Sequence, residues 1–137
     1  GWGHISISHC SDALLIGWSS KKIGVDIERK DRKFNAKKLS KRFFSDNENQ
    51  EIEKLTESKI KEKVITRWLI KEAAFKWQGE RINRNLRQWI WIDNSDFAFN
   101  TKFGYEVKVY NQSFKEWNYA IATNKEILTT KPIICIN

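Results

Sequence analysis

Two acidic residues, Asp26 and Glu28, lie two positions apart in the segment KIGVDIE (22–28). The alternation of apolar and polar residues in this segment predicts a strand, so both side chains point to the same face, with Cα atoms about 6.6 Å apart. Their carboxylates can converge on one cation, and Mg²⁺ takes one or two carboxylates together with water and substrate phosphates. The pair is compatible with a magnesium site, but a half-exposed strand with its polar face in water is the more common source of this pattern.

Three charged residues, Lys71, Glu72 and Lys76, interrupt the otherwise apolar segment WLIKEAAFKW (68–77). At 100° per residue, a helix places Lys71 on one flank and Glu72 and Lys76 on the other. Because apolar residues surround nearly the whole helix, these charges need partners, since an unpaired buried charge is costly. The simplest alternative is an ion pair between Glu72 and Lys76 at positions i and i+4.

Ser8 and His9 end the first predicted strand. A hydroxyl and an imidazole beside a basic surface can hold a phosphate group. The alternative is that His9 is an ordinary turn residue.

The strands that would hold these residues follow from the apolar periodicity. HISISH, ALLIGWS and KIGVDIE are short β segments joined by linkers short enough for hairpins, which predicts an antiparallel meander over residues 3–28. Four more β segments follow the helices: WIWID, DFAFN, YEVKVYN and WNYAIAT. We predict one α+β domain over residues 1–137, with an antiparallel sheet and one long helix packed on it.

Helical patterns occupy the middle of the chain. One covers about residues 36–44, and Ser45 followed by Glu48 has the spacing of a capping box. After a solvated helix and connector, the strongest helical pattern runs from about residue 60 to 77 and ends at Gly79.

Composition excludes some classes of protein and leaves others open. With 40% apolar and 31% charged residues, the 137-residue chain is too rich in core formers for disorder and too charged to span a membrane. No export signal is recognisable, which favours the cytoplasm. The formal charge of +8 favours an acidic partner, such as a phosphorylated ligand or an acidic protein. The charge and seven tryptophans also keep a nucleic-acid-binding module open as an alternative.

Four segments occur together in a recognisable order: ISISHC, IGVDIE, KRFFSDNE and WLIKEAAFK. In this order the chain resembles the 4′-phosphopantetheinyl transferase superfamily, whose signature is a G-[IV]-D strand followed by a W-x-x-KE-[AS]-x-x-K helix. The serine-histidine element and Glu28 resemble the larger, two-lobed branch that activates synthetases. The resemblance implies a transferase that moves the 4′-phosphopantetheine arm of coenzyme A to a serine of an apo acyl or peptidyl carrier protein and releases adenosine 3′,5′-bisphosphate. Such enzymes serve fatty acid, polyketide and nonribosomal peptide biosynthesis.

The resemblance also implies roles for individual residues. Asp26, Glu28 and Glu72 would bind Mg²⁺, with Mn²⁺ as an alternative metal. The expected contacts to coenzyme A, the co-substrate, come from Ser8, His9, Lys71 and Lys76. The catalytic set comprises Lys76 and two candidates for the general base, Glu48 and Glu72.

The implied partner is an acidic carrier protein, for which residues 29–42, together with Phe34, Leu39, Phe43 and Phe44, form the expected docking face. The alternative is a solvated basic helix whose aromatic residues belong to the core. Cys10 departs from the resemblance, because it stands where a second serine is frequent. Against the two-lobed branch, we also expect the 137 residues to lack most of an N-terminal lobe. With such a lobe the protein is expected to be a monomer, and without it a homo-oligomer. A non-catalytic relative that binds carrier proteins is the remaining alternative.

Overall fold

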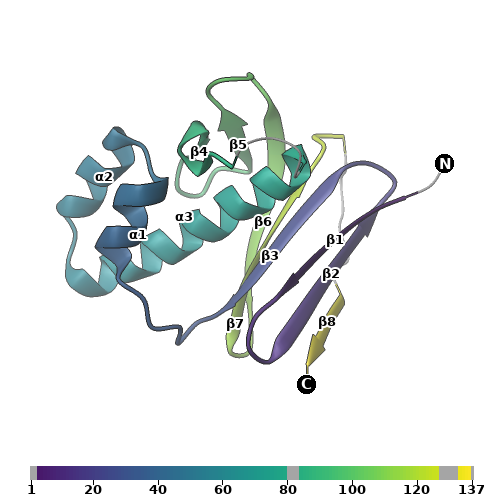
Figure 1. Cartoon of the computed structure of the whole chain (residues 1–137), viewed down its shortest axis with the longest axis horizontal. Coiled ribbons are helices and arrows are strands. Elements are labelled where there is room, and N and C mark those ends of the chain that lie inside the picture. The colour runs from purple at the N-terminus through teal and green to yellow at the C-terminus, as the bar shows by residue number, and fades with distance from the viewer. Residues whose placement is uncertain (1–2, 80–83, 127–132, 137) are drawn as a thin grey trace.

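The computed structural model of the chain describes residues 3–79, 84–126 and 133–136. These residues form two antiparallel sheets and three α-helices, with the long helix α3 lying diagonally across the strands (Figure 1). In chain order the elements are β1 (His4–His9), β2 (Ala13–Ser19), β3 (Ile23–Arg29), α1 (Ala36–Phe43), α2 (Asp46–Glu53), α3 (Glu57–Gln78), the 3₁₀ turn η1 (Leu86–Gln88), β4 (Trp89–Trp91), β5 (Phe97–Asn100), β6 (Glu106–Phe114), β7 (Trp117–Thr123) and β8 (Ile133–Ile136). The predicted α+β class, with antiparallel strands and one dominant helix, is confirmed.

The expectation of a three-stranded meander is wrong for its third strand. β1 and β2 pair as a hairpin, but β2 takes β8 as its other neighbour, while β3 pairs with β7 at the edge of a five-stranded sheet of order β3-β7-β6-β5-β4. The apolar face of β3 is the physical reason. Ile23, Val25 and Ile27 stack on Ala13 and Leu15 of β2, so the two strands meet face to face in separate sheets rather than edge to edge.

Helix α3 covers the opposite face of the five-stranded sheet. Its Leu69 and Ala73 are fully buried in a cluster with Val107 of β6 and with Ala120 and Ala122 of β7. The contact with β3 is closest at Gly24, where a Cβ would overlap the carbonyl oxygen of Ala73. Only glycine lets the backbone of the helix lie directly on this strand.

The start of α2 follows the predicted capping box. The hydroxyl of Ser45 accepts a hydrogen bond from the amide of Glu48, and the carboxylate of Glu48 accepts one from the amide of Ser45. α1 has the predicted boundaries to within one residue and ends with Lys41 and Arg42 in its last turn, where positive charge suits the helix dipole. The third helix begins at Glu57, three residues earlier than predicted, and is capped by Gly79.

The aromatic residues expected on the docking face belong largely to the core. Phe44 is 1% exposed, and Phe34, Leu39 and Phe43 pack against the buried cluster between α1, α2 and α3. What remains on the surface of α1 is basic, namely Lys37, Lys38, Lys41 and Arg42. Among the described residues, no helix is long and apolar enough to cross a membrane.

Candidate active site

Asp26 lies on the face of β3 that meets α3, and only 8% of the residue is exposed. Its Oδ1 accepts a hydrogen bond of 2.8 Å from the hydroxyl of Ser8 and lies 3.5 Å from the Nζ of Lys76. Its Oδ2 is buried without a hydrogen-bond partner. Burial raises the pKa of this carboxyl group, and the nearby charge of Lys76 and the hydrogen bond from Ser8 offset that effect only in part.

Two serines of β1 connect it to the free edge of β3. The hydroxyl of Ser6 accepts a 3.0 Å hydrogen bond from the amide of Val25, and the hydroxyl of Ser8 accepts one of 3.1 Å from the amide of Ile27. The side chains thus satisfy amides that β3 does not use in pairing with β7, as buried backbone donors require. Because these amides alternate along β3, the serines must be two apart, as in ISIS.

Lys76 of α3 contacts both β1 and β3. Its Nζ donates to the carbonyl oxygens of Ile7, at 3.3 Å, and Val25, at 3.0 Å, and lies beside Asp26 Oδ1. One ammonium group therefore links α3, β1 and β3. Lys76 was expected to face the phosphates of coenzyme A, and its partners in this structure are two carbonyl groups and a carboxylate.

Glu28 follows Asp26 on the same strand, and its carboxylate has a cationic partner. Its Oε2 lies 2.7 Å from the Nη1 of Arg32, and the guanidinium of Arg32 lies over the rings of Trp68 and Phe34. The side chain of Arg32 is 37% exposed, so it is free to change partners at the surface. Sequence reasoning missed this residue, although a basic residue four positions after Glu28 was a visible signal.

Glu72 extends from α3 and forms an ion pair with Arg84, which lies between α3 and η1. The side chain of Glu72 is 10% exposed, whereas that of Arg84 is 45% exposed and lies over the ring of Phe43. The alternative of an ion pair between Glu72 and Lys76 is not what forms, because Lys76 turns to Asp26 instead. Arg84 follows no recognisable motif, so no sequence pattern identified it.

The three predicted metal ligands occur on adjoining elements, but each has a basic partner: Lys76 for Asp26, Arg32 for Glu28 and Arg84 for Glu72. Within residues 3–79, 84–126 and 133–136, no three His, Cys, Asp or Glu side chains are gathered closely enough to hold a metal ion. The oxygen-only donor set suits Mg²⁺ chemically, and the buried, unpartnered Oδ2 of Asp26 is an atom that a cation would satisfy. Binding would require Glu28 and Glu72 to leave their half-exposed arginines.

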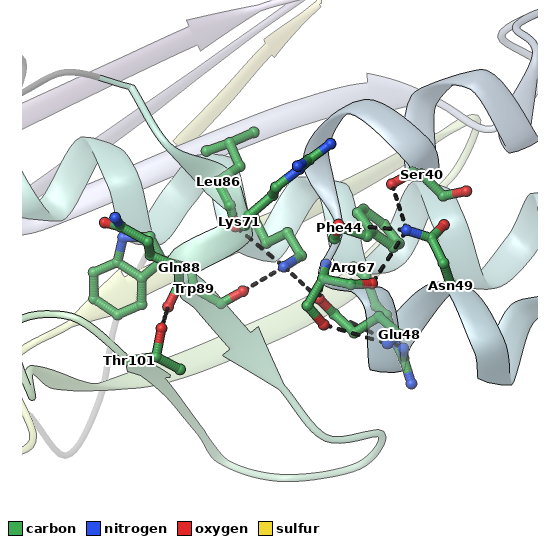
Figure 2. A network of polar contacts seen from close by, with 12 residues as sticks. Ser40, Phe44, Glu48, Asn49, Arg67, Lys71, Leu86, Gln88, Trp89 and Thr101 are labelled. Carbon is green, nitrogen blue, oxygen red and sulfur yellow. Dashed lines mark hydrogen bonds and ion pairs between the residues drawn. The ribbon is translucent and has the colours of Figure 1, made fainter.

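Two predicted site residues, Lys71 and Glu48, lie in a different place. The Nζ of Lys71 lies 2.9 Å from Glu48 Oε1 and 3.1 Å from the carbonyl oxygen of Leu86, and it also donates to the carbonyl of Trp89 (Figure 2). Only 1% of Lys71 is exposed. It therefore has no open face to offer to a phosphate, and the expectation that it faces the coenzyme does not fit this structure.

Glu48 belongs to the same internal network rather than to the surroundings of Asp26. Its Oε2 lies 3.8 Å from Arg67, which also pairs with Glu51 and Asp93. The prediction that Lys71 and Glu72 lie on different flanks of α3 agrees with this arrangement. The flank of Lys71 packs on α2 and β4, and the flank of Glu72 meets Arg84.

Ser8 and His9 differ in their exposure to solvent. Ser8 is 5% exposed and its hydroxyl is used inside the protein, while His9, at the end of β1, is exposed. Of this pair, only the imidazole is accessible to a ligand.

Comparison with known proteins gives this site a context. A model of the 4′-phosphopantetheinyl transferase superfamily matches residues 22–130. A protein of Synechocystis sp. that carries the provisional name 4′-phosphopantetheinyl transferase is 36% identical over 90 residues, which make up 65% of this chain and 37% of the relative. The chain thus spans little more than a third of the length of this relative. Because the family model covers well over half of the chain, including Asp26, Glu28 and Glu72, the chain belongs to the 4′-phosphopantetheinyl transferase superfamily.

Proposed function

We propose that this protein transfers the 4′-phosphopantetheine arm of coenzyme A to a serine of an acidic acyl or peptidyl carrier protein, in the manner of the two-lobed branch of the superfamily. The observation that carries the proposal is the environment of Asp26. A carboxylate with one oxygen held by two donors and the other buried without a partner is unfavourable in a protein that binds nothing there. Membership of the superfamily supports a reaction in which such a group has a use.

Mg²⁺, when bound to Asp26, Glu28 and Glu72, would neutralise charge on the pyrophosphate of coenzyme A. The basic side chains that now hold Glu28 and Glu72 would then be released beside the phosphates. Arg32 and Arg84, which are half-exposed, fit this phosphate-binding role better than the buried Lys71 does. Exposed His9 is a further candidate for a phosphate contact.

In the transfer itself, the serine oxygen of the carrier protein forms a bond to the phosphorus that bears the pantetheine arm. The bond from that phosphorus to the bridging oxygen breaks, and adenosine 3′,5′-bisphosphate leaves with the electron pair. A base takes the proton of the serine hydroxyl. Of the two candidates, Glu48 is buried away from Asp26 with its Oε1 shared between Lys71 and the amide of Ser45, so we assign this role to Glu72, through the oxygen that does not hold the metal.

Recognition of the carrier protein is assigned to the basic surface of α1. Lys37, Lys38, Lys41 and Arg42 are exposed there and would attract an acidic partner by long-range electrostatics. Since the neighbouring aromatic residues are core residues, charge rather than apolar contact would dominate docking, and binding would weaken with added salt.

The direct test is incubation of the full-length protein with coenzyme A, MgCl₂ and a panel of apo carrier proteins from fatty acid, polyketide and peptide synthesis. Mass spectrometry should show a carrier protein heavier by one phosphopantetheine arm. Asp26→Asn and Glu72→Gln should abolish the increase. Glu62→Gln, an exposed change on the same helix, should leave it intact. No mass increase on any carrier protein, together with salt-sensitive binding of bare oligonucleotides, would replace the proposal with a nucleic-acid-binding role.

A further inference from the structure

We infer that Ser8 is a positioning residue that selects which oxygen of Asp26 is left to bind a divalent cation, rather than a residue that contacts coenzyme A. The inference rests on the proposed function, because it concerns the metal that the transferase would use. The contacts of Ser8, Lys76 and Asp26 at the junction of β1, β3 and α3 carry it.

The hydroxyl of Ser8 has no hydrogen left to donate to a phosphate oxygen. It has one hydrogen, which it donates to Asp26 Oδ1 at 2.8 Å, and it accepts the amide of Ile27 at 3.1 Å. The residue is 5% exposed, so a phosphate could reach this hydroxyl only if the bond to Asp26 were broken and the strands separated.

The same contacts fix the orientation of the Asp26 carboxylate. The amide of Ile27 belongs to β3 and holds the Ser8 oxygen in place, and that oxygen in turn holds Oδ1. Lys76 reaches the same atom while anchored to the carbonyl groups of Ile7 and Val25. Both donors converge on Oδ1.

As a result, the second carboxylate oxygen of Asp26, Oδ2, receives no hydrogen bond. Oδ2 is buried and lacks a hydrogen-bond partner, whereas Oδ1 has two donors. A carboxylate that is clamped through one oxygen presents the other in a fixed direction, which is how residues behind a metal ligand tune its affinity. Oδ2 is therefore the oxygen assigned to the cation.

Ser6 provides a matched control within the same strand. It is buried like Ser8 and accepts an amide of β3 in the same way, from Val25 at 3.0 Å. Asp26, however, is held by Ser8. Removing either hydroxyl breaks a link between β1 and β3, but only removal of the Ser8 hydroxyl takes a donor from the carboxylate, which then keeps Lys76 alone at Oδ1.

The test measures binding of Mn²⁺ alone, in the absence of coenzyme A, by electron paramagnetic resonance of the free ion. The full-length wild-type protein is compared with Ser8→Ala, Ser8→Thr and Ser6→Ala, and circular dichroism and thermal unfolding are recorded for each. Ser8→Ala should weaken Mn²⁺ binding about 10–100-fold, as is typical when a residue behind a metal ligand is removed. Ser6→Ala should stay within about twofold of wild type, and Ser8→Thr, which retains the hydroxyl, should recover most of the affinity.

Two outcomes of this experiment would overturn the inference. If Ser8→Ala binds Mn²⁺ like Ser6→Ala but has a raised KM for coenzyme A, Ser8 contacts the coenzyme directly and the inference is overturned while the proposed function stands. If the wild-type protein binds no Mn²⁺ in the absence of coenzyme A, the inference is overturned, while the mass measurement on carrier proteins decides the proposed function separately. Should Ser8→Ala fail to fold, the pair Ser8→Thr and Ser8→Val, which share a shape and differ in the hydroxyl, gives the same comparison.

Discussion

Lys71 and Glu48 form an ion pair of 2.9 Å inside the protein, where Lys71 is 1% exposed and Glu48 5%. Lys71 also donates to the carbonyl groups of Leu86 and Trp89, so one ammonium group joins α2, α3, η1 and β4 (Figure 2). Burial lowers the pKa of Lys71, and the charge and hydrogen bond of Glu48 oppose this only in part. The lysine of the signature helix is thus a structural connection in this chain.

Replacing Lys71 with methionine should therefore destabilise the protein. The change leaves the Glu48 carboxylate buried beside a thioether and removes the donor from two carbonyl groups. Loss of one partner from a buried pair typically costs about 3–5 kcal/mol of unfolding free energy. Urea denaturation followed by circular dichroism measures this loss of unfolding free energy.

A double-mutant cycle separates the pair from the rest of the network. Lys71→Met combined with Glu48→Gln should be less destabilising than the sum of the two single changes, because neither charge is then left alone. Strictly additive effects would show that the two side chains do not stabilise each other.

The sequence predicted those parts of the structure that depend on local patterns. The capping box at Ser45 and Glu48, the helix ending at Gly79 and the two flanks of α3 all follow from spacing within a few residues. The partners of the charged side chains do not follow from such local spacing. Whether Glu72 meets Lys76 or Arg84 depends on how distant segments pack, and periodicity carries no information about that.

The strand pairing of β3 was missed for a related reason. A short linker after β2 favours a hairpin, but Ile23, Val25 and Ile27 are buried in one cluster with Ala13 and Leu15 of β2, while the edge of β3 pairs with β7. The serines of β1 then satisfy the amides left on β3, a role that side-chain alternation alone does not reveal.

Asp93 gives a prediction about pH. It lies in the turn after β4, and burial alone would raise its pKa, but the hydrogen bond from Lys63 and the charge of Arg67 outweigh this effect and hold the pKa below its usual value. A carboxylate whose pKa is lowered by folding stabilises the protein above the unfolded value of about 3.9 and loses this effect as the pH falls through the folded value.

Asp93→Asn should accordingly lower the free energy of unfolding at pH 7 by on the order of 1 kcal/mol, since Asp93 is partly exposed and its pairs are screened. The difference from wild type should stay constant down to about pH 5 and shrink below about pH 4. Urea unfolding at several pH values shows this directly. A difference that grows on acidification would mean that Asp93 is not stabilised as an anion.

Asp26 gives a prediction in which stability and function oppose each other. Burial raises the pKa of Asp26, so its ionised form is unfavourable in the protein without metal at pH 7. Asp26→Asn keeps the shape and removes the charge, so the melting temperature should rise, by the equivalent of about 0.5–2 kcal/mol. Mn²⁺ binding and phosphopantetheine transfer should both be lost. A lower melting temperature would show that the pairing with Lys76 outweighs the desolvation of the carboxylate.

Gly24, the glycine of the G-V-D segment, gives the last prediction, which concerns the distance between the strand and helix that carry the acidic residues. A Cβ at Gly24 would overlap the carbonyl oxygen of Ala73 and lie 2.5 Å from the amide nitrogen of Trp77. Both are backbone atoms of α3, so β3 and the helix must move apart to admit a methyl group. Gly24→Ala should destabilise the protein by about 1–3 kcal/mol, as overpacking does.

The displacement should also reach the site, because Asp26 is two residues along β3 from Gly24 and Glu72 precedes Ala73 on α3. Mn²⁺ binding should weaken in Gly24→Ala under conditions in which the variant remains folded. Gly104→Ala is the matched control: its site has a φ of 74° but no atom within 4 Å of the added Cβ, so it should lose stability through backbone strain and bind Mn²⁺ normally. Normal Mn²⁺ binding in folded Gly24→Ala would contradict the view that close contact between β3 and α3 sets the position of the carboxylates.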